Sequence, residues 1–133
     1  MPSVGTPVGL PAQVDLRIRQ GSDVTWALTY RETDPDGTTR PNTFVGWSAR
    51  AQVRKRVGGE VWHAMTSGPD ITLTTVDDKL TLTGRIAHSV TENTGWDDRD
   101  FGCWDVELVR ADGTVIPLAA GQVYIEHDVT RDA

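Results

Sequence analysis

Cysteine is nearly absent from this sequence, whose 133 residues contain one, Cys103. A single thiol excludes an internal disulfide framework, so the chain either folds in a reducing compartment or does not need such bridges. Cys103 directly precedes Trp104 at the start of an apolar strand pattern. We therefore interpret it as a small buried hydrophobe rather than as a nucleophile.

Long apolar runs and an excess of positive charge are also missing. No stretch approaches the ~20 apolar residues of a membrane-spanning helix, and residues 1–13 carry neither the basic region nor the apolar run of a signal peptide. The net charge of −6 argues against nonspecific nucleic-acid binding, which needs a basic face. We expect a protein that is made in the cytoplasm, with neither a membrane nor a nucleic acid as partner.

The common catalytic and metal-binding motifs are missing as well. The chain contains no Gly-x-Ser-x-Gly elbow, no phosphate-binding loop and no His-Glu-x-x-His pattern. Its histidines, His63, His88 and His127, are not at ligand spacing. The acidic run at 97–100 leaves a weak calcium site open, although a solvated loop is the simpler interpretation. We expect neither enzyme activity nor a cofactor.

What the sequence does contain is a repeated alternation of apolar and polar residues, clearest in 24–31 and 47–54. A period of two places one set of side chains on each face of a strand. Many such segments, separated by Gly, Asp and Pro turns and without a convincing helix, predict an antiparallel β-sandwich of about eight strands. The expected strand segments are 14–19, 23–31, 47–54, 61–65, 71–76, 80–85, 101–110, 115–118 and 121–130.

The chain length suits one domain, which we place at 14–131. Residues 1–13 are rich in Pro and Gly and predict an extended arm, either a frayed terminus or a strap that pairs with a neighbouring subunit. Near residues 88–95 we expect at most one short helical turn, with Ser89 as its N-cap and Glu92 three residues later. Pro117 indicates a strand that lies at a sheet edge or is interrupted.

Five tryptophans are many for a chain of this length. Trp26, Trp47 and Trp104 occupy inward positions of three expected strands, and we interpret them as core residues. Trp62 is out of phase with the residues beside it, and Trp96 ends a loop next to acidic residues. These two either cap the ends of the core or are exposed, where tryptophan contacts protein partners or stacks on sugar rings.

Charged residues form two stretches of opposite sign. Complementary potentials set the register and encounter rate of protein complexes, although ordinary solvated charges would explain the same stretches. We expect the basic stretch to form an edge of the domain and the acidic stretch to lie in a loop. The hypothetical partner-contact residues are Arg50, Arg54, Lys55, Arg56, Trp62, Trp96, Asp97, Asp98 and Asp100.

The order of the motifs resembles a known family. Arg-Gln-Gly-Ser-Asp-Val-Thr-Trp at 19–26, Asp-Pro-Asp-Gly-Thr at 34–38 and the strand at 45–54 are similar to segments of small immunoglobulin-like β-sandwich proteins of tailed bacteriophages. The matching segments at 104–108, 111–115 and 121–125 continue the resemblance over nearly the whole chain. The family includes the N-terminal domains of upper-baseplate proteins and related minor tail or decoration proteins. The resemblance implies an immunoglobulin-like fold and a place in the virion.

The first functional hypothesis is a non-enzymatic virion protein, present in several copies and docked on the tail or baseplate. Its partners would be other virion structural proteins or copies of itself in a symmetric assembly, so that modest contacts add through avidity. The expected contact regions are the arm, the basic stretch and the loop at 96–100. Capsid decoration is one alternative. A carbohydrate-binding module, in which Trp62 and Trp96 stack on sugars, is another.

Overall fold

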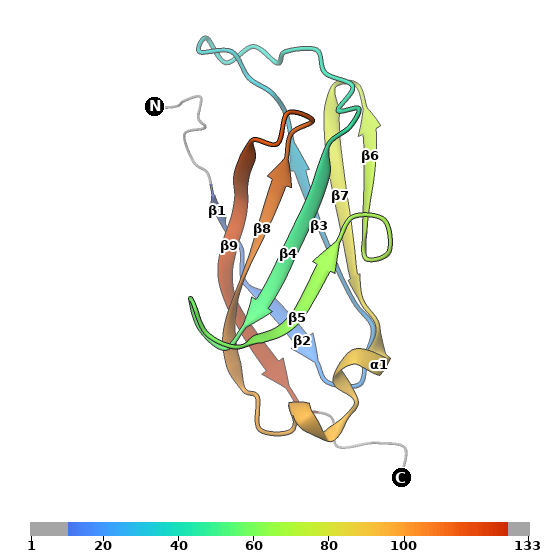
Figure 1. The fold of residues 1–133 in the computed structure, drawn as a ribbon, viewed down its shortest axis with the longest axis vertical. Coiled ribbons are helices and arrows are strands. Elements are labelled where there is room, and N and C mark those ends of the chain that lie inside the picture. The colour runs from blue at the N-terminus through green and yellow to red at the C-terminus, as the bar shows by residue number, and fades with distance from the viewer. Residues whose placement is uncertain (1–10, 128–133) are drawn as a thin grey trace.

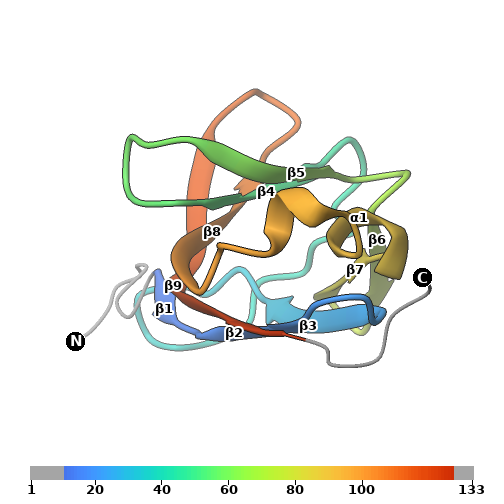
Figure 2. The same cartoon turned by 90° about the horizontal axis from the view of Figure 1, so that it is seen from below.

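A computed structural model describes residues 11–127 as two β-sheets packed face to face (Figures 1 and 2). The larger sheet, called sheet A here, has the strand order β1-β9-β8-β4-β5, and β2 also pairs with β9. Its strands are β1 Ala12–Gln13, β2 Leu16–Arg19, β4 Ser48–Arg54, β5 Val61–Thr66, β8 Phe101–Val109 and β9 Val115–Glu126. Sheet B has the order β3-β7-β6, with β3 Val24–Tyr30, β6 Ile71–Val76 and β7 Lys79–Ile86.

The predicted all-β sandwich is therefore confirmed, with nine strands in the described residues. The strands expected at 115–118 and 121–130 are one strand, β9, as far as Glu126. Pro117 is tolerated within it because the β8–β9 register shifts between Val106 and Glu107, and because β1 joins the other side of β9 only from Ala119 onward. Residues 128–131 of the predicted domain lie outside the described residues.

The N-terminal boundary also differs from the prediction. Ala12 and Gln13, the end of the predicted arm, pair in parallel with Ala119 and Ala120 of β9, so the sheet begins before residue 14. The expected strand 14–19 is paired only from Leu16 onward. Residues 1–10, which make up the rest of the arm, lie outside the described residues.

The core is built from the inward residues of both sheets. Trp26 of β3 and Trp104 of β8 meet edge to face at its centre, with ring centroids 5.3 Å apart. Gly84 of β7 lies directly beneath Trp26, where a β-carbon would overlap the indole ring. The indole nitrogen of Trp104 donates to the carbonyl oxygen of Val14 at 2.8 Å and ties the start of the domain to the core. The predictions for Trp26 and Trp104 are therefore correct.

The upper end of the sandwich in Figure 1 is closed by the connection between β3 and β4. Glu32, which belongs to this connection, is buried and forms a bidentate ion pair with Arg110. The guanidinium carbon of Arg110 lies 4.8 Å from the ring centroid of Trp47. Tyr30 donates to the same carboxylate at 3.2 Å. Trp47 is only half-buried against the core, so its assignment as a core residue is right in part.

The lower end is closed by the segment between β7 and β8 (Figure 1). It contains one α-helical turn, His88–Thr91, and a separate 3-10 turn, Thr94–Trp96. Ser89 is not the N-cap, because the turn begins at His88 and its N-cap position is Ala87, two residues before Ser89. The backbone N–H of His88 donates instead to the Asp23 carboxylate at 2.8 Å, so the capping acceptor comes from a distant part of the chain.

Candidate functional site

The outer face of sheet A is an open surface of the described part. Side chains alternate along each strand, so this face carries every second residue of β4, β8 and β9. No described helix or strand lies over it in Figures 1 and 2. The face presents Arg50, Gln52 and Arg54 from β4, Phe101, Cys103, Asp105 and Glu107 from β8, and Ala120, Gln122 and Tyr124 from β9.

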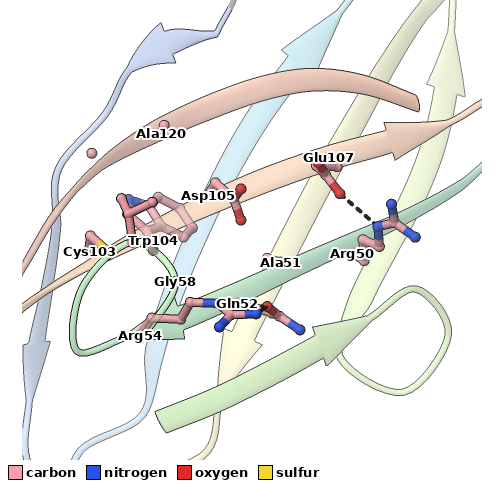
Figure 3. A pocket seen from close by; sticks show the side chains of 12 residues that line it. Arg50, Ala51, Gln52, Arg54, Gly58, Cys103, Trp104, Asp105, Glu107 and Ala120 are labelled. Carbon is pink, nitrogen blue, oxygen red and sulfur yellow. Dashed lines mark hydrogen bonds and ion pairs between the residues drawn. The ribbon is translucent and has the colours of Figure 1, made fainter. Parts of the chain in front are cut away.

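A hollow of about 660 Å³ lies in this face. It is bordered by the outward side chains of β4 and β8, by the tip of the β4–β5 hairpin and by β9 (Figure 3). The wall formed by β9 consists of Ala120 and Gly121, and the hairpin contributes Val57 and Gly58. Small residues on these two sides leave the space that larger side chains would fill.

The arginines of the hollow are held in fixed positions. Arg50 donates to Glu107 across the β4–β8 ladder at 2.7 Å. Arg54 donates twice to the side-chain oxygen of Gln52, at 3.0 and 2.7 Å, and once to the carbonyl oxygen of Gly59 at 2.8 Å. Such bonds reduce the rotamer entropy that a partner would otherwise have to restrict on binding.

Asp105 differs from its charged neighbours. It lies between Arg50 and Arg54 along the hollow (Figure 3), but accepts no hydrogen bond from any residue of the described part. Partial burial raises the pKa of its carboxyl group, and the negative charge of Glu107 raises it further. The positive charges of Arg54 and Arg50 oppose this increase. The side chain of Asp105 is nevertheless exposed, and no described residue donates a hydrogen bond to its carboxylate.

Cys103 does not occupy the position expected for it. Phe101, Cys103 and Asp105 share one face of β8, and Trp104 points to the other. Cys103 is therefore half-buried in the wall of the hollow rather than in the core. The strand was predicted correctly, but the parity that places Trp104 inside requires both of its neighbours to point outward.

The basic stretch is not an edge of the domain. β4 is paired on both sides, with β8 and with β5, so Arg50 and Arg54 lie in the interior of sheet A. Lys55 and Arg56 follow β4 in the exposed hairpin toward β5. The stretch thus divides into two residues that border the hollow and two at the hairpin, and the contact role of all four remains a prediction.

Trp62 and Trp96 form a closed cluster at the lower end of the sandwich. Their ring centroids are 6.0 Å apart, and the guanidinium carbon of Arg99 lies 5.1 Å from the Trp62 centroid and 4.6 Å from that of Trp96. Trp96 is 3% exposed, so its assignment as a contact residue is wrong. The carbohydrate-binding alternative requires the rings of both Trp62 and Trp96 to be exposed, and the burial of Trp96 counts against it.

The unusual phase of Trp62 has a structural cause. Val53 pairs with His63 and Arg54 pairs with Val61, which leaves Trp62 as the extra residue of a β-bulge. The bulge turns its ring toward Gly102 and the core, where it is half-buried. Both tryptophans therefore cap the end of the core, as the simpler of the two interpretations predicted.

The acidic stretch lies beside this cluster. Asp97 accepts from the side-chain nitrogen of the buried Gln20 at 2.9 Å, and Asp100 lies 2.7 Å from Nε2 of His127. The other ring nitrogen of His127 is 2.7 Å from the side-chain oxygen of Gln20. Asp98 is exposed. Over residues 11–127, no group of three or more His, Cys, Asp or Glu side chains is placed to hold a metal ion.

An aromatic group on the outer face was missed in the sequence. Phe101 is 53% exposed and meets Tyr124 of β9 edge to face, with ring centroids 5.5 Å apart. The guanidinium carbon of Arg17 lies 5.1 Å from the Tyr124 centroid. The alternation along β8, which points Asp105 and Glu107 outward, also predicts that Phe101 points outward. The position of Arg17 beside Tyr124 could not be predicted in this way, because it depends on the parallel pairing of β2 with β9.

No protein-family model matches the chain, and no curated protein matches it either. Among the described residues, no helix has the length and apolar character needed to cross a membrane.

Proposed function

We propose that this protein is a non-enzymatic structural protein of a bacteriophage virion, present in several copies and docked on the tail or baseplate. The docking surface would be the outer face of sheet A. The observation that carries this proposal is the hollow in that face, whose arginines are already fixed by hydrogen bonds before any partner binds. Preorganised polar groups around an open, partly apolar surface suit protein–protein contact.

The strand order supports the immunoglobulin-like part of the proposal. In such sandwiches strands B, E and D oppose a sheet that contains C, F and G. Here β3, β7 and β6 oppose a sheet that contains β4, β8 and β9, in matching chain order. The resemblance of the sequence motifs to phage virion proteins supports the location, and the fold alone does not assign it.

Mass spectrometry of purified virions tests the location. We expect the chain in intact particles at a fixed stoichiometry of several copies, and in tails after these are separated from capsids. Detection in capsids alone would favour the decoration alternative. Absence from purified particles would refute a virion role.

A pair of matched variants tests the surface. Ala120→Arg places a long side chain in the hollow, whereas Ala27→Arg places the same side chain on the exposed outer face of sheet B. We expect only Ala120→Arg to reduce incorporation into particles. Equal incorporation of the two variants would show that the docking surface lies elsewhere.

A further inference from the structure

The outer face of β8 offers two chemically different contact points in one line. Asp105 provides a carboxylate without a hydrogen-bond partner in the described part, and Phe101 provides an aromatic ring that is 53% exposed. The two residues are four positions apart on the same face of one strand, a separation of about 13 Å at ~3.3 Å per residue. Cys103 lies between them and is half-buried.

The other charged groups of the hollow are less available. Arg50 and Glu107 neutralise each other, and Arg54 already makes three hydrogen bonds to neighbouring oxygens. A partner that binds these groups has to replace bonds that exist, whereas a partner that binds Asp105 adds one. Because a carboxylate gains most from a charged donor, the matching group is an ammonium or guanidinium group.

The charge of the whole chain points to the same partner chemistry. The net charge of −6 repels a second copy at long range and attracts a basic segment. Phe101 adds an exposed apolar anchor, and aromatic side chains, phenylalanine included, are enriched in protein interfaces.

We propose that the outer face of β8 binds an extended segment of another protein, which carries a lysine or arginine and, four residues away, a large apolar side chain. In an extended segment, residues i and i+4 point to the same side and match the spacing of Asp105 and Phe101. The basic group would contact Asp105 in the hollow, and the apolar group would pack on Phe101 beside Tyr124. This inference names the partner chemistry of the surface in the proposed function and rests on it.

The test uses the whole chain and a capped synthetic peptide, Thr-Lys-Thr-Thr-Thr-Leu-Thr, with amide chemical shifts measured by NMR. We expect saturable shifts confined to β4, β8 and β9. A peptide with glutamate in place of lysine should bind at least about fivefold more weakly, and this comparison requires no protein variant.

Protein variants separate the two contact points. Asp105→Asn and Phe101→Ser should each weaken binding of the lysine peptide at least about fivefold. Matched controls should leave it unchanged: Asp77→Asn removes an exposed carboxylate in the turn between β6 and β7 of sheet B, and Val76→Ser removes an exposed apolar side chain on the same sheet.

Four outcomes would overturn the inference: no shifts at millimolar peptide, equal binding of the glutamate peptide, an effect of Asp77→Asn equal to that of Asp105→Asn, or the same shifts produced by self-association of the chain. If the peptide does not bind but the chain is present in purified virions, this inference is wrong and the proposed function is unaffected. Absence from virions with normal peptide binding overturns the proposed function alone.

Discussion

The ion pair between Glu32 and Arg110 allows a sharp test of what holds the upper end of the sandwich. Arg110→Met removes the guanidinium but retains an unbranched side chain to cover Trp47. The side chain of Glu32 is 8% exposed and that of Arg110 is 32% exposed. The substitution therefore leaves a buried carboxylate that keeps the Tyr30 hydroxyl as a hydrogen-bond donor.

Breaking a buried ion pair by removing one partner costs about 3–5 kcal/mol. Arg110 is about one-third exposed, so water reaches part of the pair and reduces this cost. We expect Arg110→Met to lower the free energy of unfolding by about 2–3 kcal/mol. For a domain of this size the corresponding fall in Tm is roughly 6–15 °C.

Urea unfolding followed by tryptophan fluorescence measures the effect. The double variant Arg110→Met/Glu32→Gln should recover at least about 1 kcal/mol relative to the sum of the single variants, because it leaves no buried charge. Arg40→Met is the control, since its partner Asp34 lies in the same connection and both side chains are well exposed. It should destabilise the domain much less than Arg110→Met does, because water screens this exposed pair. Additive single effects, or an Arg110→Met effect no larger than that of Arg40→Met, would refute the reasoning.

Three further predictions concern the core and its polar contacts. Burial and the charge of Glu32 raise the pKa of Tyr30 from 10.0 to about 12, so the folded state holds the phenolic proton more tightly than the unfolded state does. The free energy of unfolding should therefore fall as pH rises from 10 toward 12. Urea midpoints measured over this range should fall less in Tyr30→Phe. Gly84→Ala should lower the free energy of unfolding by about 1–3 kcal/mol because its β-carbon overlaps the Trp26 ring, and unchanged thermal unfolding would contradict this. Gln20 is 1% exposed, so Gln20→Ala should cost about 1–3 kcal/mol by leaving its partners unsatisfied, whereas a cost near zero in urea unfolding would mean that those groups bind water instead.

Strand positions could be predicted from the sequence because alternation reports burial directly. Ala49, Ala51 and Val53 are buried as their pattern indicates, and the residues between them point outward. The pairing order could not be predicted in this way. That β4 is internal to sheet A and that β1 and β2 run parallel to β9 depend on contacts between distant segments, which a period of two does not encode.

The tryptophans show where local pattern is insufficient. Trp26 and Trp104 keep the phase of their strands and were assigned correctly. The phase of Trp62 is shifted by a bulge, and Trp96 is buried by a 3-10 turn that folds back against the sheet. In both cases an irregularity of one or two residues decides whether a ring is exposed, and composition carries no signal of it.

Hydrogen bonding, rather than the number of like charges in sequence, decides which side chains of the outer face remain available to a partner. A count of charges weights Lys55 and Arg56 more than the isolated Asp105, yet Lys55 and Arg56 lie in an exposed hairpin, where hydration and side-chain entropy reduce the gain from an ion pair. Arg54 is closer to the hollow but already makes three hydrogen bonds. Asp105 is also exposed, but it lies on a paired strand in the lining of the hollow and lacks a hydrogen-bond donor among the described residues. A cationic group that reaches it therefore gains an interaction without breaking one, which makes this carboxylate the strongest candidate for recognition on the surface.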